Sequence, residues 1–286
     1  MSDTPPREKW IVSADWLAAR LDDPNVVVLD ASWTLKPEPG IGTPHEEFID
    51  NRIPSARFFD IDDVADPDTD LPHMLPSPEL FAEKVGALGI SNDHTVIVYD
   101  TFAPFAAPRA WWMFRVMGHD DVAVLNGGLE AWELAGHPTE RGEAARPAPQ
   151  LFTPRLRPHL LAGIDDVKRA LASGERQVLD ARSPGRFAGE DEEPHPHVPP
   201  GHMPGAKNLH FELFLTPEGG YRDVAEIERI FAERGIDPAA PSIFSCGSGV
   251  TACLPLLAAA RLGHENHPVY DGSWSEWATR DDTEIV

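Results

Sequence analysis

The sequence predicts an α/β protein with two tandem domains, each a mainly parallel sheet flanked by helices on both faces. Two observations carry this prediction. The chain of 286 residues repeats segments of its own sequence at an offset of about 150 residues. In each copy, short apolar runs alternate with helical patterns, which is typical of parallel sheets that are buried on both faces.

The internal repeat keeps its order along the chain. Four pairs of similar segments are separated by 150, 150, 146 and 145 residues. A period of this length indicates duplicated domains, because solenoid repeats are much shorter. In order, the pairs are Val28–Ala31 with Val178–Ala181, Ile53–Arg57 with Met203–Lys207, Leu88–Ile90 with Arg234–Ile236, and Asn126–Gly128 with Asp271–Ser273.

A proline-rich stretch separates the two copies. Residues 136–158 contain five prolines interspersed with charged residues, and this composition predicts a semi-stiff linker. We therefore predict an N-terminal domain at 1–137, a linker at 138–159 and a C-terminal domain at 160–286. A second irregular stretch, Gly189–Pro200, is rich in Glu, Pro and His. Long loops within compact domains are often functional.

The elements of each copy follow from the apolar pattern and the capping residues. Ser13 can cap a helix that starts at Ala14, because a serine side chain accepts hydrogen bonds from the first amides of a helix. Apolar runs rich in β-branched residues predict strands. In the first half we predict helices at Ala14–Leu17, Glu79–Leu88 and Ala110–Met117, and strands at Val26–Leu29, Val96–Tyr99 and Val122–Leu125. In the second half we predict strands at Gln177–Leu179, Ser242–Ser245 and Pro268–Tyr270, and a helix that begins after Thr251.

Composition and charge exclude several functions. Acidic residues outnumber basic ones by 47 to 24, which gives a formal net charge of -23. Such a chain repels phosphate backbones and anionic lipid, so we expect neither nucleic-acid nor membrane binding.

No apolar run reaches the roughly 18 residues of a membrane-spanning helix, and the first ten residues lack a signal-peptide pattern. The only cysteines, Cys246 and Cys253, suit a reducing compartment, so we expect a cytoplasmic protein.

The segment Cys246-Gly247-Ser248-Gly249-Val250-Thr251 has the pattern of an anion-binding loop. It follows a predicted strand and precedes a predicted helix, at the sheet edge where open α/β sheets bind ligands. The two glycines let successive amides turn toward one atom, and the dipole of the following helix adds positive potential. A thiolate placed there is a stabilised nucleophile, to which the Ser248 and Thr251 hydroxyls can donate. We expect this thiol to be open to solvent.

The first half carries a carboxylate where the second half carries the thiol. Asp100 follows the strand predicted at Val96–Tyr99, and the residues after it lack the Gly-x-Gly spacing. We therefore predict that the C-terminal domain is catalytic and the N-terminal domain is catalytically inactive. The alternative for Cys246 is a small residue buried at a strand end, which is common for free cysteines.

Together these motifs resemble those of the tandem rhodanese-fold sulfurtransferases over nearly the whole chain. The loop at 246–252 resembles the active loop of the 3-mercaptopyruvate sulfurtransferases. The resemblance implies two rhodanese-like domains and a persulfide formed on Cys246. Thiosulfate-using relatives usually carry basic residues in this loop, so its lack of charge implies a preference for 3-mercaptopyruvate. The other matching segments are Pro108–Arg115, Leu179–Arg182, Gly185–Phe187, Gly201–Gly205 and Asp271–Trp274.

The resemblance also implies which residues hold the donor. Mercaptopyruvate carries a carboxylate, which an arginine can grip with two parallel hydrogen bonds. The arginine of the family's Gly-Arg-Phe segment binds substrate, which implies this role for Arg186. The alternative for Arg186 is a surface ion pair with Glu190 or Asp191. Arg182 either contributes to substrate binding or pairs with Asp180 and braces the loop.

Several positions depart from the family's pattern or remain outside the proposed site. His195 stands where mercaptopyruvate enzymes often have a second arginine, and we assign it to substrate binding, with a pH dependence if its imidazole is protonated. Arg52 stands where relatives often carry a His. The family assigns a proton relay to that His and the loop serine, so Ser248 is the candidate for this role that remains here. We interpret Trp111–Trp112 and Cys253 as packing residues, with a redox role as the alternative for Cys253.

The predicted reaction is a two-step sulfur transfer. The Cys246 thiolate attacks the sulfur of 3-mercaptopyruvate and pyruvate leaves as its enolate. A thiol acceptor such as thioredoxin or glutathione, or cyanide, then removes the outer sulfur. We predict no cofactor and no metal, because the His and Glu residues at 189–202 lack metal-ligand spacing.

Three other functions remain as alternatives. They are a thiosulfate:cyanide sulfurtransferase, a non-catalytic rhodanese-fold binding module and a phosphatase. The phosphatase is disfavoured because the sixth residue after Cys246 is Ala252, whereas phosphate loops of this fold type have the pattern Cys-(x)5-Arg.

Overall fold

The structure, a computed structural model, describes residues 8–35, 40–101, 105–195 and 197–286. It divides into two compact units. The first comprises Met1–Val64, Pro76–Leu156 and Pro217–Tyr221, and the second comprises Ala65–Leu75, Arg157–Thr216 and Arg222–Val286. Each unit therefore includes a short segment from the other half of the sequence, and the residues of the predicted linker up to Leu156 belong to the first unit.

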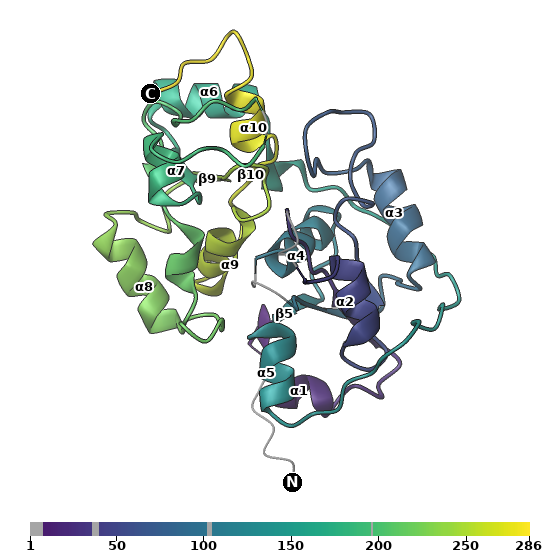
Figure 1. Cartoon of the computed structure of the whole chain (residues 1–286). Helices are drawn as coiled ribbons and strands as arrows, with labels where there is room; N and C mark the ends of the chain where they lie inside the picture. Colours follow the sequence, from purple (N-terminus) through teal and green to yellow (C-terminus); the bar gives the residue numbers. More distant parts are fainter. Residues whose placement is uncertain (1–7, 36–39, 102–104, 196) are drawn as a thin grey trace. The chain divides into compact units, whose positions relative to one another are not determined.

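Five strands and five helices make up the described part of the first unit (Figure 1). The strands are β1 (Ile11–Val12), β2 (Val26–Asp30), β3 (Arg57–Phe58), β4 (Thr95–Tyr99) and β5 (Val122–Leu125). The helices are α1 (Ala14–Ala18), α2 (Pro44–Asp50), α3 (Pro78–Ala87), α4 (Ala107–Val116) and α5 (Gly128–Leu134). The sheet has the order β1-β5-β4-β2-β3, and all of these pairings are parallel.

Both faces of the first sheet are covered. Strands β2, β4 and β5 are buried almost throughout, as expected for apolar runs without a polar face. On one face, Trp16 of α1, Phe48 of α2 and Trp132 of α5 join a single apolar cluster. Helices α3 and α4 meet through Phe81 and Phe114, whose ring centroids are 5.2 Å apart.

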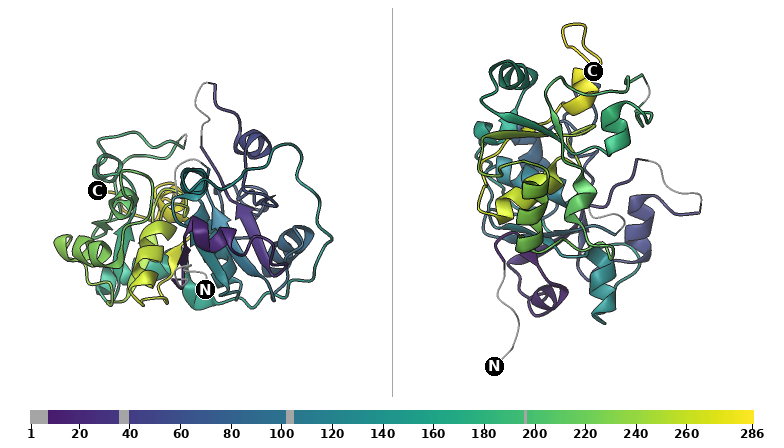
Figure 2. Two further views of the ribbon diagram at one scale, coloured as in Figure 1. Left: turned by 90° about the horizontal axis from the view of Figure 1, so that it is seen from below. Right: turned by 90° about the vertical axis from the view of Figure 1, so that its left-hand side faces the viewer.

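The second unit repeats this architecture (Figures 1 and 2). Its strands are β6 (Leu161–Ala162), β7 (Gln177–Asp180), β8 (Lys207–Asn208), β9 (Ser242–Ser245) and β10 (Val269–Tyr270). Its α-helices are α6 (Ile164–Ser173), α7 (Pro184–Ala188), α8 (Val224–Glu233), α9 (Cys253–Arg261) and α10 (Ser273–Trp277), and short 3₁₀ helices lie at Pro158–Leu160 and Phe211–Phe214. The sheet order, β6-β10-β9-β7-β8, is the order of the first unit, and its pairings are again parallel.

Helices also cover both faces of the second sheet. In Figure 1, α6 and α10 lie on one face and α8 and α9 lie on the other. Val167 of α6 and Trp274 of α10 join one apolar cluster with the strands. The prediction of two α/β units with parallel sheets is therefore confirmed, because the duplicated sequence folds into duplicated topology.

The elements themselves agree with the sequence to different degrees. The predicted strands Val122–Leu125 and Ser242–Ser245 coincide with β5 and β9. Ser13 caps α1, since its hydroxyl oxygen accepts a hydrogen bond from the Trp16 amide at 3.1 Å. Arg186 belongs to α7, a short helix that the sequence analysis does not predict. Ser183 caps that helix and Pro184 starts it, a combination that favours helix initiation.

Candidate active site

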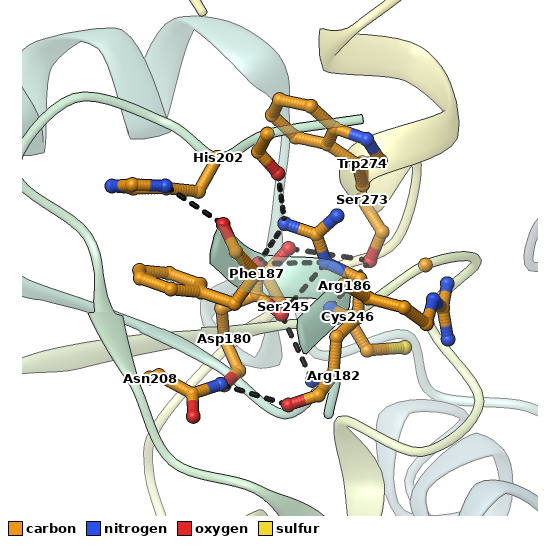
Figure 3. Close-up of polar contacts among 12 residues, drawn as sticks. Asp180, Arg182, Arg186, Phe187, His202, Asn208, Ser245, Cys246, Ser273 and Trp274 are labelled. Atoms are coloured by element: carbon orange, nitrogen blue, oxygen red, sulfur yellow. Dashed lines mark hydrogen bonds and ion pairs between the residues drawn. The ribbon is translucent and has the colours of Figure 1, made fainter. Parts of the chain in front are cut away.

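Cys246 directly follows β9, the central strand of the second sheet, and is the first residue of the loop that leads to α9. Figure 3 shows it among side chains from neighbouring strand ends, including Asp180 at the end of β7. The carboxyl ends of these parallel strands meet at one edge, where open α/β sheets bind their ligands. The topology therefore brings the predicted nucleophile and the strand that precedes Arg182 and Arg186 to the same edge.

The N-terminal part of α10 holds the backbone of the cysteine loop. The Cys246 amide donates to the Ser273 hydroxyl oxygen at 3.2 Å, and the Trp274 amide donates to the Cys246 carbonyl at 3.0 Å. The Gly247 carbonyl accepts from both the amide and the hydroxyl of Ser275, at 2.9 and 2.8 Å. These four hydrogen bonds hold the start of the loop rigidly against the end of the sheet.

Four of the other loop amides are free to donate to a ligand. Among the residues that the structure describes, the amides of Gly247, Ser248, Val250 and Thr251 donate no hydrogen bond. Gly249 has a φ of 76°, a left-handed conformation that favours glycine and lets the loop curl. Unpaired amides near a helix N-terminus bind anions, which is the property that a thiolate or persulfide would use.

The thiol itself is more covered than the sequence leads one to expect. Cys246 is 2% exposed, so the expectation of a thiol open to solvent is wrong for this structure. Val250 of the same loop is also 2% exposed, and Ser248 is 8% exposed. The Cys246 side chain is therefore almost completely covered in this structure.

Arg186 lies against the cysteine loop. A Cβ atom added to Gly247 would be 2.7 Å from Arg186 Nη2, so the guanidinium occupies the space that a side chain at position 247 would need. In the view of Figure 3 the Arg186 guanidinium and the Cys246 sulfur point in the same direction. The side chain of Arg186 is 25% exposed, so part of its guanidinium faces solvent.

Two arginines and two carboxylates form a chain of ion pairs beside the loop. Arg182 Nη2 lies 2.6 Å from Asp180 Oδ2, and Arg182 Nη1 lies 2.8 Å from Glu193 Oε1. Glu193 Oε2 in turn accepts from Arg186 Nη2 at 2.5 Å. Of the two alternatives given for Arg182, the structure shows the pair with Asp180. The partner of Arg186 is Glu193, not Glu190 or Asp191.

Arg182 has the contacts of a bracing residue. Its side chain is 0% exposed, it donates to the Gly201 carbonyl at 2.9 Å, and its guanidinium lies over the Trp274 ring at 4.5 Å. Burial alone would lower the pKa of Arg182, but the carboxylates of Asp180 and Glu193 raise it above its usual value. We therefore interpret Arg182 as the residue that joins β7 to the 189–200 loop, with little capacity left for substrate.

His195 lies in the electrostatic field of Arg186. Burial lowers the pKa of His195 below its usual value, and the charges of His73 and Arg186 lower it further, against an opposing effect of Glu193. His73 belongs to the 65–75 segment of the second unit, where the Leu75 amide donates to Asp271 Oδ2 at 2.6 Å. Arg186 also lowers the pKa of His210, so the imidazoles of His195 and His210 both lie in its field, and the sequence interpretation named only His195.

We expect the affinity for a carboxylate donor to depend on His195. At neutral pH the imidazole is uncharged, because its pKa is lowered. As the pH falls through that pKa the ring gains a positive charge next to Arg186, so KM for 3-mercaptopyruvate should fall by roughly threefold to tenfold. The measurement is KM for both the wild-type protein and His195→Gln between pH 7 and 5. The variant should lose the decrease of KM at acid pH. An identical pH profile in both proteins would remove His195 from the site.

The start of the corresponding loop in the first unit, at Asp100, is held in a similar way. The Leu129 amide donates to the Asp100 carbonyl at 3.0 Å. The Trp274 amide donates to the Cys246 carbonyl in the same way, with the donor 145 and the acceptor 146 residues later. Gly128 and Ser273, also 145 residues apart, share left-handed φ values of 58° and 50°. Burial raises the pKa of Asp100 well above its usual range, although hydrogen bonds from the Ala107 amide oppose this effect. Residues 102–104, which continue this loop, lie outside the described part of the chain.

The other singled-out residues have structural contacts. Arg52 is fully buried in the first unit, where its guanidinium lies 2.8 Å from Glu140 Oε1 and also donates to the Phe48 carbonyl. Cys253 is the first residue of α9, is 0% exposed and donates from Sγ to the Gly249 carbonyl at 3.4 Å. The side chains of Trp111–Trp112 are also fully buried.

The described residues contain no group of three or more His, Cys, Asp or Glu side chains arranged to hold a metal ion. None of the described helices has the length and apolar character needed to cross a lipid bilayer.

Comparisons with known proteins identify the family. The rhodanese-like domain family matches residues 13–135 and 164–280. The human 3-mercaptopyruvate sulfurtransferase is 42% identical over 277 residues, which cover 94% of this chain and 92% of that protein. The thiosulfate/3-mercaptopyruvate sulfurtransferase 2 of Arabidopsis thaliana is 41% identical over 296 residues, which cover 96% of this chain and 86% of that protein.

The fold comparison agrees with the sequence comparison. The crystal structure of a 3-mercaptopyruvate sulfotransferase from Escherichia coli matches with a TM-score of 0.84 and 39% identity, over 93% of this chain and 99% of that one. A duplicated parallel sheet with a cysteine at the end of its central strand defines a protein of the rhodanese class. The chain belongs to the 3-mercaptopyruvate and thiosulfate sulfurtransferase family, whose members are built from tandem rhodanese domains. The predicted family and fold are therefore confirmed.

Sequence reasoning missed several residues that shape this site. Ser273 and Ser275 hold the loop backbone, and Glu193 joins the two arginines. A signal for Ser273 was present, because it aligns with Gly128 in the repeat, and both residues have left-handed φ values in the structure. Glu193 had no such signal, since four consecutive acidic residues, 190–193, are equivalent on spacing alone.

Proposed function

We propose that this chain transfers sulfur from 3-mercaptopyruvate through a persulfide on Cys246 and releases pyruvate. The observation that carries the proposal is the loop after β9, whose unpaired amides adjoin the guanidinium of Arg186. An anion-binding loop next to a partly exposed arginine suits a donor with a carboxylate at one end and sulfur at the other.

In the first step, the Cys246 thiolate attacks the sulfur of the donor. A sulfur–sulfur bond forms, the carbon–sulfur bond breaks, and its electron pair passes to the enolate of pyruvate. The enolate then takes up a proton, which the donor's own S–H can supply, and the persulfide anion remains. The amides of Gly247, Ser248, Val250 and Thr251 stabilise the sulfur anion before and after the transfer.

Arg186 positions the donor for this attack. Its guanidinium adjoins Gly247 and uses one edge for Glu193, which leaves N–H groups for the donor carboxylate. His195 adds to this binding when its imidazole is protonated. Because Cys246 is 2% exposed, a local opening of the loop or its cover precedes donor binding.

In the second step, a thiol such as thioredoxin or glutathione, or cyanide, removes the outer sulfur and regenerates the Cys246 thiolate. The N-terminal domain, with Asp100 in place of the cysteine, has no catalytic role in this scheme. The domain boundaries at 137 and 160 and the cytoplasmic location remain predictions.

The test is turnover on two donors under the same conditions. We expect pyruvate release from 3-mercaptopyruvate with a kcat/KM at least about tenfold above that for thiosulfate, since the loop carries no cationic side chain to hold a dianion. The acceptor in both assays is cyanide, so that only the donor differs. A higher kcat/KM for thiosulfate would instead support a thiosulfate:cyanide sulfurtransferase. One relative, from Cricetulus griseus, is named a thiosulfate sulfurtransferase.

A further inference from the structure

The Glu193 carboxylate lies beside the donor site but takes no part in the steps of the proposed reaction. We propose that this carboxylate sets the donor preference of the site, because it neutralises Arg186 and so favours a monoanionic donor over a dianionic one. The inference rests on the proposed function, since it concerns the same donor site. Glu193 acts through Arg186, and we treat it as a positioning and specificity-determining residue.

The carboxylate of Glu193 is built into the site. Its side chain is 1% exposed, although the three acidic residues before it are exposed. Oε1 accepts from Arg182 Nη1 at 2.8 Å, and Oε2 accepts from Arg186 Nη2 at 2.5 Å. A buried carboxylate that bridges two guanidiniums is held in one place by charge-assisted hydrogen bonds.

The charges of this cluster cancel. Asp180 and Glu193 contribute two negative charges, and Arg182 and Arg186 contribute two positive ones, so their sum is zero. The adjoining loop, residues 246–251, contains no charged side chain. His195 and His210, which both lie in the field of Arg186, have pKa values lowered chiefly by burial and are uncharged at neutral pH.

A neutral cluster discriminates between donors by their charge. 3-Mercaptopyruvate brings one negative charge on its carboxylate, whereas thiosulfate brings two to the same place. In a partly buried site the cost of removing an uncompensated ion from water grows steeply with its charge, so the dianion is penalised more strongly than the monoanion. Arg186 can still grip a carboxylate through its remaining N–H groups, but no excess positive charge is present to hold a second negative charge.

Removing the negative charge of Glu193 should therefore shift the preference toward thiosulfate. In Glu193→Gln the cluster gains one net positive charge while the side chain keeps its shape and one hydrogen-bond acceptor. We expect the ratio of kcat/KM for thiosulfate to kcat/KM for 3-mercaptopyruvate to rise by roughly tenfold. Glu190→Gln, an exposed change three residues away, is the matched control and should leave the ratio unchanged.

The ratio of kcat/KM for the two donors distinguishes an effect of the Glu193 charge from an effect on the position of Arg186. If Glu193 only held Arg186 in place, its loss would raise KM for both donors and leave their ratio near the wild-type value, which would overturn the proposal. Glu193→Asp supplies a second test, because it keeps the charge and shortens the side chain. We expect KM to rise in this variant while the ratio stays within about twofold of wild type. A shift as large as that of Glu193→Gln would contradict the charge argument.

The wild-type protein gives an independent test that needs no variant to fold. Nitrate and sulfate are monoanionic and dianionic probes, and a neutral cluster should bind sulfate no more tightly than nitrate. Sulfate inhibition that is tenfold stronger than nitrate inhibition would overturn the proposal. Failure of the proposed function would look different, because the wild-type protein would then release no pyruvate from 3-mercaptopyruvate.

Discussion

Replacement of Cys246 by serine is expected to lower pyruvate release from 3-mercaptopyruvate by at least about a thousandfold. The hydroxyl of serine stays protonated at neutral pH, and an oxygen cannot form the persulfide on which both steps depend. The measurement is initial-rate pyruvate formation with a thiol acceptor. Because the side chains are nearly the same size and Cys246 is 2% exposed, the fold should change little.

The matched control is the second cysteine. Cys253 is fully buried, at the first residue of α9, and the proposed reaction gives it no chemical role. Cys253→Ala should therefore keep pyruvate release within a fewfold of wild type. Pyruvate release by Cys246→Ser at a rate near wild type would contradict the proposed mechanism, whatever the behaviour of the control.

Replacement of Arg182 by leucine is expected to destabilise the second unit by about 3–5 kcal/mol. Arg182 is 0% exposed and pairs with Asp180 and Glu193, whose side chains are each 1% exposed. Leucine cannot compensate either carboxylate, and Asp180 would keep a buried charge without its ion-pair partner. Lost contact with the Trp274 ring adds to the effect.

Urea unfolding measures this effect as a loss in the free energy of unfolding. Arg169→Leu is the control, because Arg169 is also an arginine paired with an aspartate, but its side chain is 71% exposed. Exposed pairs contribute little, so this change should stay within about 0.5 kcal/mol. If both substitutions lowered the free energy of unfolding equally, burial of the Arg182 ion pairs would not explain their contribution to stability.

The repeated fold could be predicted because it depends on patterns that are local in sequence. Strand Val122–Leu125 was predicted with its bounds, since an apolar, valine-rich run between Asp121 and Asn126 has few other structures available. Two-residue strands such as β1 and β3 carry no such pattern, and only pairing with a neighbouring strand defines them. The helix around Arg186 had a local signal in Ser183 and Pro184, which the interpretation did not use.

The candidate site was predictable where one segment defines it and unpredictable where distant segments meet. The loop at 246–251 contains its own glycines and follows its own strand, so its placement followed from sequence. The pairing of Arg186 with Glu193 depends on how the 189–200 loop folds back, which spacing does not determine. The cover over Cys246 likewise depends on tertiary packing, so the expectation of an open thiol was wrong.

The most direct test of the account is the mass of the peptide that contains Cys246 after the wild-type protein has been incubated with 3-mercaptopyruvate and no acceptor. The account predicts a gain of one sulfur atom on that peptide, loss of the gain when a thiol acceptor is added, and no gain on the peptide of Cys246→Ser. Pyruvate release accompanied by an unmodified Cys246 peptide, or by sulfur attached to another residue, would contradict it.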